Sequence, residues 1–182
     1  VTEYPMPYTD NGMRDFFLDK DGRIWFATTN GVIGTVNRAG RVAAMHLPRG
    51  EQLGNGLSIR RGGASILTTH ALYEMTAAAD GTPRVIWRRA YDRGKARRPG
   101  QLTWGSGTTP TYFGPGGDGW VAIVDNAERP RLLVYNTASG GLICSTPAFG
   151  RSGQGTENSP MAWGNALVIP STYGYQYPPM AV

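Results

Sequence analysis

The chain has 182 residues, 40% of them hydrophobic and 17% charged, which is enough for one domain with a sizeable core. Its 26 Gly and 13 Pro approach the content of disordered chains, but 5 Trp, 9 Tyr and 5 Phe supply apolar area that disordered chains lack. No run approaches 18 apolar residues, and the first residues lack a basic segment followed by an apolar one. We therefore expect neither a membrane span nor an intact signal peptide.

The net positive charge is confined to one segment, residues 88–98. Its six basic side chains are Arg88, Arg89, Arg93, Lys95, Arg97 and Arg98. Against them stands Asp92 alone, so the segment carries +5, the formal net charge of the whole chain. A nucleic-acid surface spreads basic residues along a groove, so we expect no specific nucleic-acid binding. The segment is predicted to connect two structural units, either as a solvated loop or as a docking site for an acidic partner.

Cys144 is the only cysteine, which excludes an intrachain disulfide and a zinc site of ordinary spacing. Leu142 and Ile143 precede it, so we expect a buried, inert thiol. A partner cysteine outside this chain stays an open alternative.

Helical periodicity is nearly absent, and turn residues recur every eight to twelve positions, which indicates an all-β fold. Four segments repeat one order: a short strand, a Gly-containing turn and an uninterrupted apolar strand. The strand pairs are predicted at 16–18 and 24–29, 57–59 and 65–69, 111–113 and 120–125, and 161–163 and 166–171. The first three segments add a third and an outer strand, at 32–36 and 41–47, 72–75 and 84–88, and 132–135 and 142–145.

The strand ends Thr29, Thr69, Asp125 and Ser171 are spaced by 40, 56 and 46 residues. These intervals are typical of β-propeller blades, and four strands make one blade. We expect about four blades, at approximately 10–48, 53–90, 101–147 and 156–182, with 1–8 as an outer strand of a preceding or closing blade. Larger propellers need more residues, so a fragment of a larger propeller is favoured over four-bladed closure. A β-sandwich with coincidental spacing is the alternative fold.

A family resemblance lies in VTEYPMP at residues 1–7, DKDGRIWFAT at 19–28 and IGTVN at 33–37. These stretches resemble the blade repeat of streptogramin (virginiamycin B) lyases, and NGL at 55–57 resembles the blade entry of gluconolactonase-type propellers. The likeness covers about 50 residues well. It implies a secreted or periplasmic propeller. It also implies a divalent cation near the central channel, held by Glu, Asn and Asp or accompanied by a catalytic His with Glu, although neither residue set maps cleanly here.

Innermost strands of successive blades bring equivalent loop positions into a ring, so distant residues can converge on one cavity. The expected ring contains Asn11, Asp15, Asn55, Thr108, Thr109, Glu157 and Asn158, and the opposite loop ends offer Asn30, His70, Asp125, Asn126, Ser171 and Thr172. Glu157, Asn158, Asn55 and Asp125 would supply the oxygen ligands that calcium or magnesium requires. Ordinary turn roles are the alternative for all four. His70 is a weak catalytic candidate, with a hydrogen-bonded loop His as the alternative.

Three functions follow from these observations. The leading one is a recognition or scaffold propeller of extracytoplasmic type that binds a protein or a small molecule, with another chain completing the propeller as a further option. The alternative is a metal-dependent lactonase or streptogramin-lyase-like enzyme with a cation in the channel. A quinone-cofactor propeller is third, and the single Cys144 argues against its vicinal cysteines.

Overall fold

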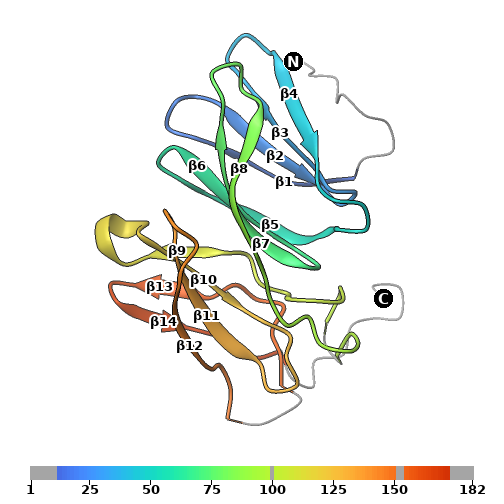
Figure 1. The fold of residues 1–182 in the computed structure, drawn as a ribbon, viewed down its shortest axis with the longest axis vertical. Helices are drawn as coiled ribbons and strands as arrows, with labels where there is room; N and C mark the ends of the chain where they lie inside the picture. Colours follow the sequence, from blue (N-terminus) through green and yellow to red (C-terminus); the bar gives the residue numbers. More distant parts are fainter. Residues whose placement is uncertain (1–11, 99–100, 151–153, 173–182) are drawn as a thin grey trace.

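The computed structural model describes residues 12–98, 101–150 and 154–172. Within these ranges it contains three four-stranded antiparallel sheets and one two-stranded sheet, each a meander in chain order (Figure 1). Blade 1 contains β1 (Met13–Leu18), β2 (Ile24–Thr28), β3 (Val32–Val36) and β4 (Val42–His46). Blade 2 contains β5 (Leu53–Arg60), β6 (Gly63–Thr68), β7 (Ala71–Ala77) and β8 (Pro83–Ala90). Blade 3 contains β9 (Thr111–Phe113), the 3-10 turn η1 (Pro115–Gly117), β10 (Trp120–Val124), β11 (Arg131–Asn136) and β12 (Leu142–Pro147). Blade 4 is represented by β13 (Met161–Trp163) and β14 (Ala166–Val168).

Each predicted strand overlaps an observed one in all four repeats, although the bounds differ; the second strand of the fourth repeat, predicted at 166–171, ends at Val168. Tight turns between first and second strands keep each hairpin in register, and Gly22 (φ 75°) and Gly62 (φ 76°) occupy left-handed conformations there. The all-β propeller prediction is confirmed. The predicted strand at 1–8, Asn11 and the tail at 173–179 lie outside the described residues.

The second strands of the first three blades are mostly apolar and are buried on both faces, with Thr28, Ser65 and Thr68 as their polar residues. Trp25 and Ala27 of β2 pack with Leu57 and Ile66 of blade 2 in one core cluster. Leu67 and Leu72 of blade 2 pack with Val121 and Ile123 of blade 3 in a second. Phe113 and Ala122 of blade 3 meet Leu167 of blade 4 in a third. Side chains from neighbouring sheets thus form a core between each pair of blades.

Polar contacts also join the blades. The buried Glu74 carboxylate of β7 accepts hydrogen bonds from the Tyr112 hydroxyl of β9 at 2.9 and 3.2 Å and pairs with Arg60 of β5. Burial and the neighbouring Glu74 charge raise the pKa of Tyr112, which keeps this hydroxyl a donor. The Trp87 indole N–H donates to the Thr137 carbonyl of blade 3 at 2.8 Å. These contacts fix the orientation of blade 3 against blade 2.

The starts of first strands and the ends of second strands share one end of each blade. Leu53 at the start of β5 pairs with Thr68 at the end of β6, because the two strands are antiparallel. The expectation that Asn55 and His70 belong to opposite loop ends was therefore wrong. We call this shared end the upper face. It carries the β2–β3, β6–β7 and β10–β11 turns and the connections between blades.

Cys144 is a second correction, because the structure exposes it on β12. β12 is the outermost strand of blade 3, where Cys144 pairs with Val134 of β11 on one side only. Apolar neighbours in the sequence do not imply burial on an outer strand.

Within the described ranges, no helix has the length and apolar character needed to cross a membrane.

Candidate functional site

Four residues from different blades and connections meet at the start of the inner strands, and we call Arg14, Asn55, Gly107 and Glu157 the channel-mouth cluster. The Arg14 guanidinium donates to the Gly54 carbonyl and lies 3.5 Å from Asn55 Oδ1. The Asn55 amide donates to the Gly107 carbonyl. A side chain on Gly107 would clash with the Glu157 carboxyl, so the absence of a Cβ there gives Glu157 its place. Asn55 and Glu157, two of the four predicted ligands, thus both lie against Gly107.

Glu157 has an unusual environment for a carboxyl group. Both of its oxygens are buried, and neither meets a hydrogen-bond donor within the described part of the chain. Burial raises the pKa of Glu157 to about 7, although the Leu102 amide and the charges of Arg14 and Arg97 favour the carboxylate. None of these three groups reaches hydrogen-bond geometry. The side chain thus changes its charge near neutral pH.

The other two proposed ligands have different surroundings. Asp125 Oδ1 accepts the backbone amides of Ala127 at 3.2 Å and Arg131 at 2.7 Å, which closes the β10–β11 turn. Burial raises the pKa of Asp125 to about 6 despite these bonds. Asn158 is exposed, and its backbone amide bonds the Thr156 hydroxyl at 2.9 Å. Across residues 12–98, 101–150 and 154–172, no three His, Cys, Asp or Glu side chains group closely enough to hold a metal ion.

His70 lies in the β6–β7 turn and contacts the connection between blades 2 and 3. Its Nδ1 is 2.9 Å from the Thr69 hydroxyl, and its Nε2 is 2.5 Å from an Arg93 nitrogen. Burial and the Arg93 charge lower the pKa of His70. A neutral ring that accepts at Nε2 fits this geometry, so His70 anchors the Arg93 side chain.

Arg93 in turn supports an exposed tryptophan. Its guanidinium lies 4.2 Å from the ring centroid of Trp104, a cation–π distance. The Trp104 indole N–H donates to the Arg93 carbonyl at 3.1 Å and to the Gly94 carbonyl at 3.2 Å. Trp104 is nevertheless 44% exposed. The structure thus holds a large aromatic surface in one orientation on the upper face.

The basic segment 88–98 is more ordered than a solvated loop. Arg88 pairs with the buried Glu51 at 2.6 Å, and Arg89 donates to the Gly140 carbonyl of blade 3 at 2.7 Å. Arg98 donates to the carbonyls of Asn126, Ala127 and Gln154. Lys95 and Arg97 are exposed, and Arg97 makes a 3.4 Å bond to the Leu102 carbonyl. Only part of the predicted docking set therefore faces outward.

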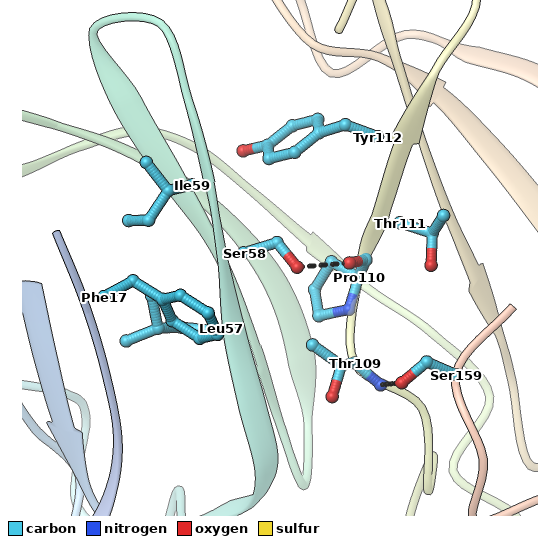
Figure 2. A pocket seen from close by; sticks show the side chains of 9 residues that line it. All are labelled: Phe17, Leu57, Ser58, Ile59, Thr109, Pro110, Thr111, Tyr112 and Ser159. Carbon is cyan, nitrogen blue, oxygen red and sulfur yellow. Dashed lines mark hydrogen bonds between the residues drawn. The ribbon is translucent and has the colours of Figure 1, made fainter. Parts of the chain in front are cut away.

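A shallow groove of about 420 Å³ lies between the inner strands of three blades. Figure 2 shows the side chains that line it. Its walls are Phe17, Leu57, Ser58, Ile59, Thr109, Pro110, Thr111, Tyr112 and Ser159. The Ser58 hydroxyl bonds the Pro110 carbonyl at 2.5 Å, and the Ser159 hydroxyl accepts the Thr109 amide at 3.1 Å. These two hydroxyl groups therefore serve to join blades.

Sequence reasoning missed Arg14, Gly107 and Trp104. Arg14 stands one residue before the ring candidate Asp15 and Gly107 one residue before Thr108, so blade alignment could have found both. Trp104 lies in a connection of no repeated pattern, and no local signal marks its exposure.

Comparisons with known proteins agree with the fold. The family model of the two component regulator propeller matches residues 7–30. An uncharacterised protein of Archaeoglobus fulgidus is 31% identical over 142 residues, covering 74% of this chain and 27% of the relative. The structure of BamB from Moraxella catarrhalis has a TM-score of 0.64 at 13% identity, covering 87% of this chain and 47% of that one. Virginiamycin B lyase from Staphylococcus aureus has a TM-score of 0.56 at 18% identity, covering 85% and 47%.

The chain spans about a quarter of the archaeal relative and about half of each solved propeller. At these identities the solved structures establish the fold alone. The expected likeness to streptogramin lyase propellers is confirmed at that level, and the chain has the β-propeller fold.

Proposed function

We propose that the protein is a recognition module that binds an acidic protein segment on its upper face, at the connection between blades 2 and 3. This proposal rests on the exposure of the Trp104 ring, whose orientation is fixed by a cation–π contact with Arg93. Tryptophan and arginine are the residues most enriched at energetic centres of protein interfaces. An extracytoplasmic location stays a prediction from the sequence resemblance.

The surroundings of Trp104 support an acidic partner. Lys95 and Arg97 are exposed on the same connection, and Leu102 beside them is 36% exposed. Positive charges at the edge of an aromatic contact increase the association rate and select acidic partners. The orienting bonds of Trp104 to two carbonyls lower the entropy lost on binding.

Fluorescence anisotropy with a fluorescein-labelled peptide of alternating Glu and Leu residues tests this proposal. Trp104→Ala should weaken binding about tenfold or more, as expected for an interface centre. Lys95→Glu with Arg97→Glu should weaken it about tenfold at 50 mM salt and less at 300 mM, because salt screens exposed charges.

Arg84→Glu is the matched control, since Arg84 is an exposed basic residue on β8 outside this connection. Equal loss of affinity in the control would mean that overall charge, and not this surface, attracts the peptide. Undiminished binding by Trp104→Ala would contradict the proposal.

A metal-dependent enzyme is the second candidate function. The buried carboxyl group of Glu157, which meets no hydrogen-bond donor among the described residues, favours it. The described residues fit a divalent cation poorly, because Glu157 is the one carboxylate of the channel-mouth cluster and Arg14 lies beside Asn55 Oδ1. A guanidinium there repels a second cation. Asp125, the other proposed carboxylate ligand, is engaged in its own turn.

Thermal unfolding in EDTA and then in excess magnesium or calcium distinguishes the two functions. If the protein binds the cation, a free cation concentration of 100 times the dissociation constant stabilises the folded state by about 2.7 kcal/mol. The midpoint temperature of thermal unfolding then rises by several degrees. The recognition function predicts no such shift. A clear shift that Glu157→Gln removes would favour the enzyme.

A further inference from the structure

One arginine joins a titratable histidine ring to the exposed tryptophan of the upper face. The Arg93 guanidinium lies between the two rings, with a nitrogen 2.5 Å from His70 Nε2 and its Cζ atom 4.2 Å from the ring centroid of Trp104. His70 and Arg93 are half-buried, whereas Trp104 is exposed. The three side chains thus connect the β6–β7 turn to the surface that we propose for binding.

The Arg93 side chain has few other supports. Its Nε atom is buried and meets no hydrogen-bond acceptor within the described part of the chain. None of the ion pairs among residues 12–98, 101–150 and 154–172 includes Arg93. No described carboxylate is therefore in place to hold the guanidinium once its bond to His70 is lost.

The charged groups around His70 come from three elements. Arg93 lies on the connection after β8, Arg88 on β8 and Glu51 on the connection before β5. The Glu51 carboxylate favours a protonated His70, but it already pairs with Arg88 at 2.6 Å. Burial and the two arginines outweigh it and lower the pKa of His70 from the ordinary value of 6.5. The ring is therefore neutral at pH 7.5 and gains its proton only in acid.

Protonation of His70 is incompatible with its bond to Arg93. A neutral ring can accept at Nε2, whereas an imidazolium donates at both nitrogens and carries a charge of the same sign as the guanidinium. The contact at Nδ1 can persist, because the Thr69 hydroxyl can accept from a protonated ring. Acid therefore breaks the contact with Arg93 and spares the contact with Thr69.

We propose that the protonation state of His70 controls the orientation of Trp104, so that the upper face releases its acidic partner as the pH falls. This inference rests on the proposed recognition function. When Arg93 moves away, Trp104 loses the cation–π contact and keeps its indole bonds to two backbone carbonyls. A ring with fewer supports loses more conformational entropy on binding, which lowers the affinity.

Nuclear magnetic resonance of the protein with isotope-labelled tryptophan tests the coupling without any partner. The Trp104 indole signal, assigned with Trp104→Phe, should shift between pH 7.5 and pH 5.0 with the same midpoint as the His70 ring signal. His70→Gln keeps an acceptor near the position of Nε2 but does not ionise, so its Trp104 signal should move much less. His46→Gln is the matched control, because His46 is an exposed histidine on β4, and it should titrate like the wild type.

Fluorescence anisotropy with the peptide of alternating Glu and Leu residues then measures the effect on binding. The affinity of the wild type and of His46→Gln should fall about threefold to tenfold from pH 7.5 to pH 5.0, as expected for the cost of ordering one side chain. The loss in His70→Gln should be smaller by this factor, because only the carboxyl groups of the peptide and of the protein then titrate. Circular dichroism of each variant at both pH values separates these effects from unfolding.

A Trp104 signal that does not follow His70, or that titrates equally in His70→Gln, would overturn the proposal. An affinity that rises in acid would also overturn it, because His70 would then act as one more positive charge toward the peptide. A coupled Trp104 signal without peptide binding at either pH would refute the recognition function and support the coupling of His70 to Trp104.

Discussion

Glu157 shows how a single residue acquires a property that its sequence context does not predict. Its carboxyl group occupies space that a side chain at position 107 would fill, and this space is free because residue 107 is glycine. The carboxyl oxygens are buried, and no hydrogen-bond donor among the described residues reaches them. Burial raises the pKa to about 7, so the folded protein binds a proton that the unfolded chain, with the ordinary value of 4.5, releases. The resulting stabilisation is complete below pH 4.5 and is lost as the pH rises through about 7.

Glu157→Gln should remove this pH dependence, because the amide cannot ionise. In EDTA at pH 8 we expect the variant to unfold at a temperature about 5 °C above that of the wild type. This corresponds to a free energy of unfolding that is larger by on the order of 2 kcal/mol. At pH 4.5 the two proteins should unfold together. Differential scanning calorimetry at both pH values measures the difference.

Glu128→Gln is the control for this experiment, since Glu128 is an exposed carboxylate in the β10–β11 turn. A Glu157→Gln variant that is less stable than the wild type at pH 8 would show that a partner stabilises the carboxylate, contrary to this account.

At the scale of elements, the connection between blades 2 and 3 is the segment whose interpretation changes most. Arg98 donates to three backbone carbonyls from the β10–β11 turn and the next connection. Arg88 and Arg89 likewise have internal partners. The basic side chains of this segment therefore have different roles. Arg98 fastens the connection, Arg88 and Arg89 combine internal bonds with exposure to solvent, and Lys95 and Arg97 face outward.

Arg98→Ala should lower the free energy of unfolding by about 2–3 kcal/mol, because three carbonyls lose a charged donor. Arg97→Ala, which removes one long bond of an exposed side chain, should change it by less than about 0.5 kcal/mol. Urea unfolding followed by tryptophan fluorescence compares the two variants. Equal effects would contradict the division of roles between these neighbours.

At the scale of the whole molecule, the blades form one series of equivalent interfaces. The cores between blades 1 and 2, 2 and 3, and 3 and 4 each combine a following face with a preceding face. The polar groups that cross these interfaces, such as Tyr112 with Glu74, add orientation to the apolar contacts. Stability in such repeats comes largely from contacts between neighbouring blades, so these interfaces hold the described blades together.

The strands were predictable because each depends on local features. An apolar run such as 120–124, a turn glycine such as Gly22 and repeated spacing act within one hairpin. Blade equivalence also led us to expect Asn55 and Glu157 at one end of the inner strands, and both lie against Gly107. The exposure of Cys144 was not predictable from its apolar neighbours, because an outer strand is covered on one side only by pairing.

The sequence by itself determined the all-β character, the repeated blades and the approximate positions of their strands, because hydrophobic periodicity and turn residues depend only on residues close together in the chain. Only the tertiary structure decided which side chains meet. Asp125 closes a turn, whereas the Glu157 carboxyl is buried beside Gly107 with no donor among the described residues. Arg98 bonds three internal carbonyls, whereas Trp104 is exposed. Burial and pairing at these positions depend on contacts between residues far apart in the chain, such as that of Arg98 with the Gln154 carbonyl, 56 positions away. No local pattern encodes such distances.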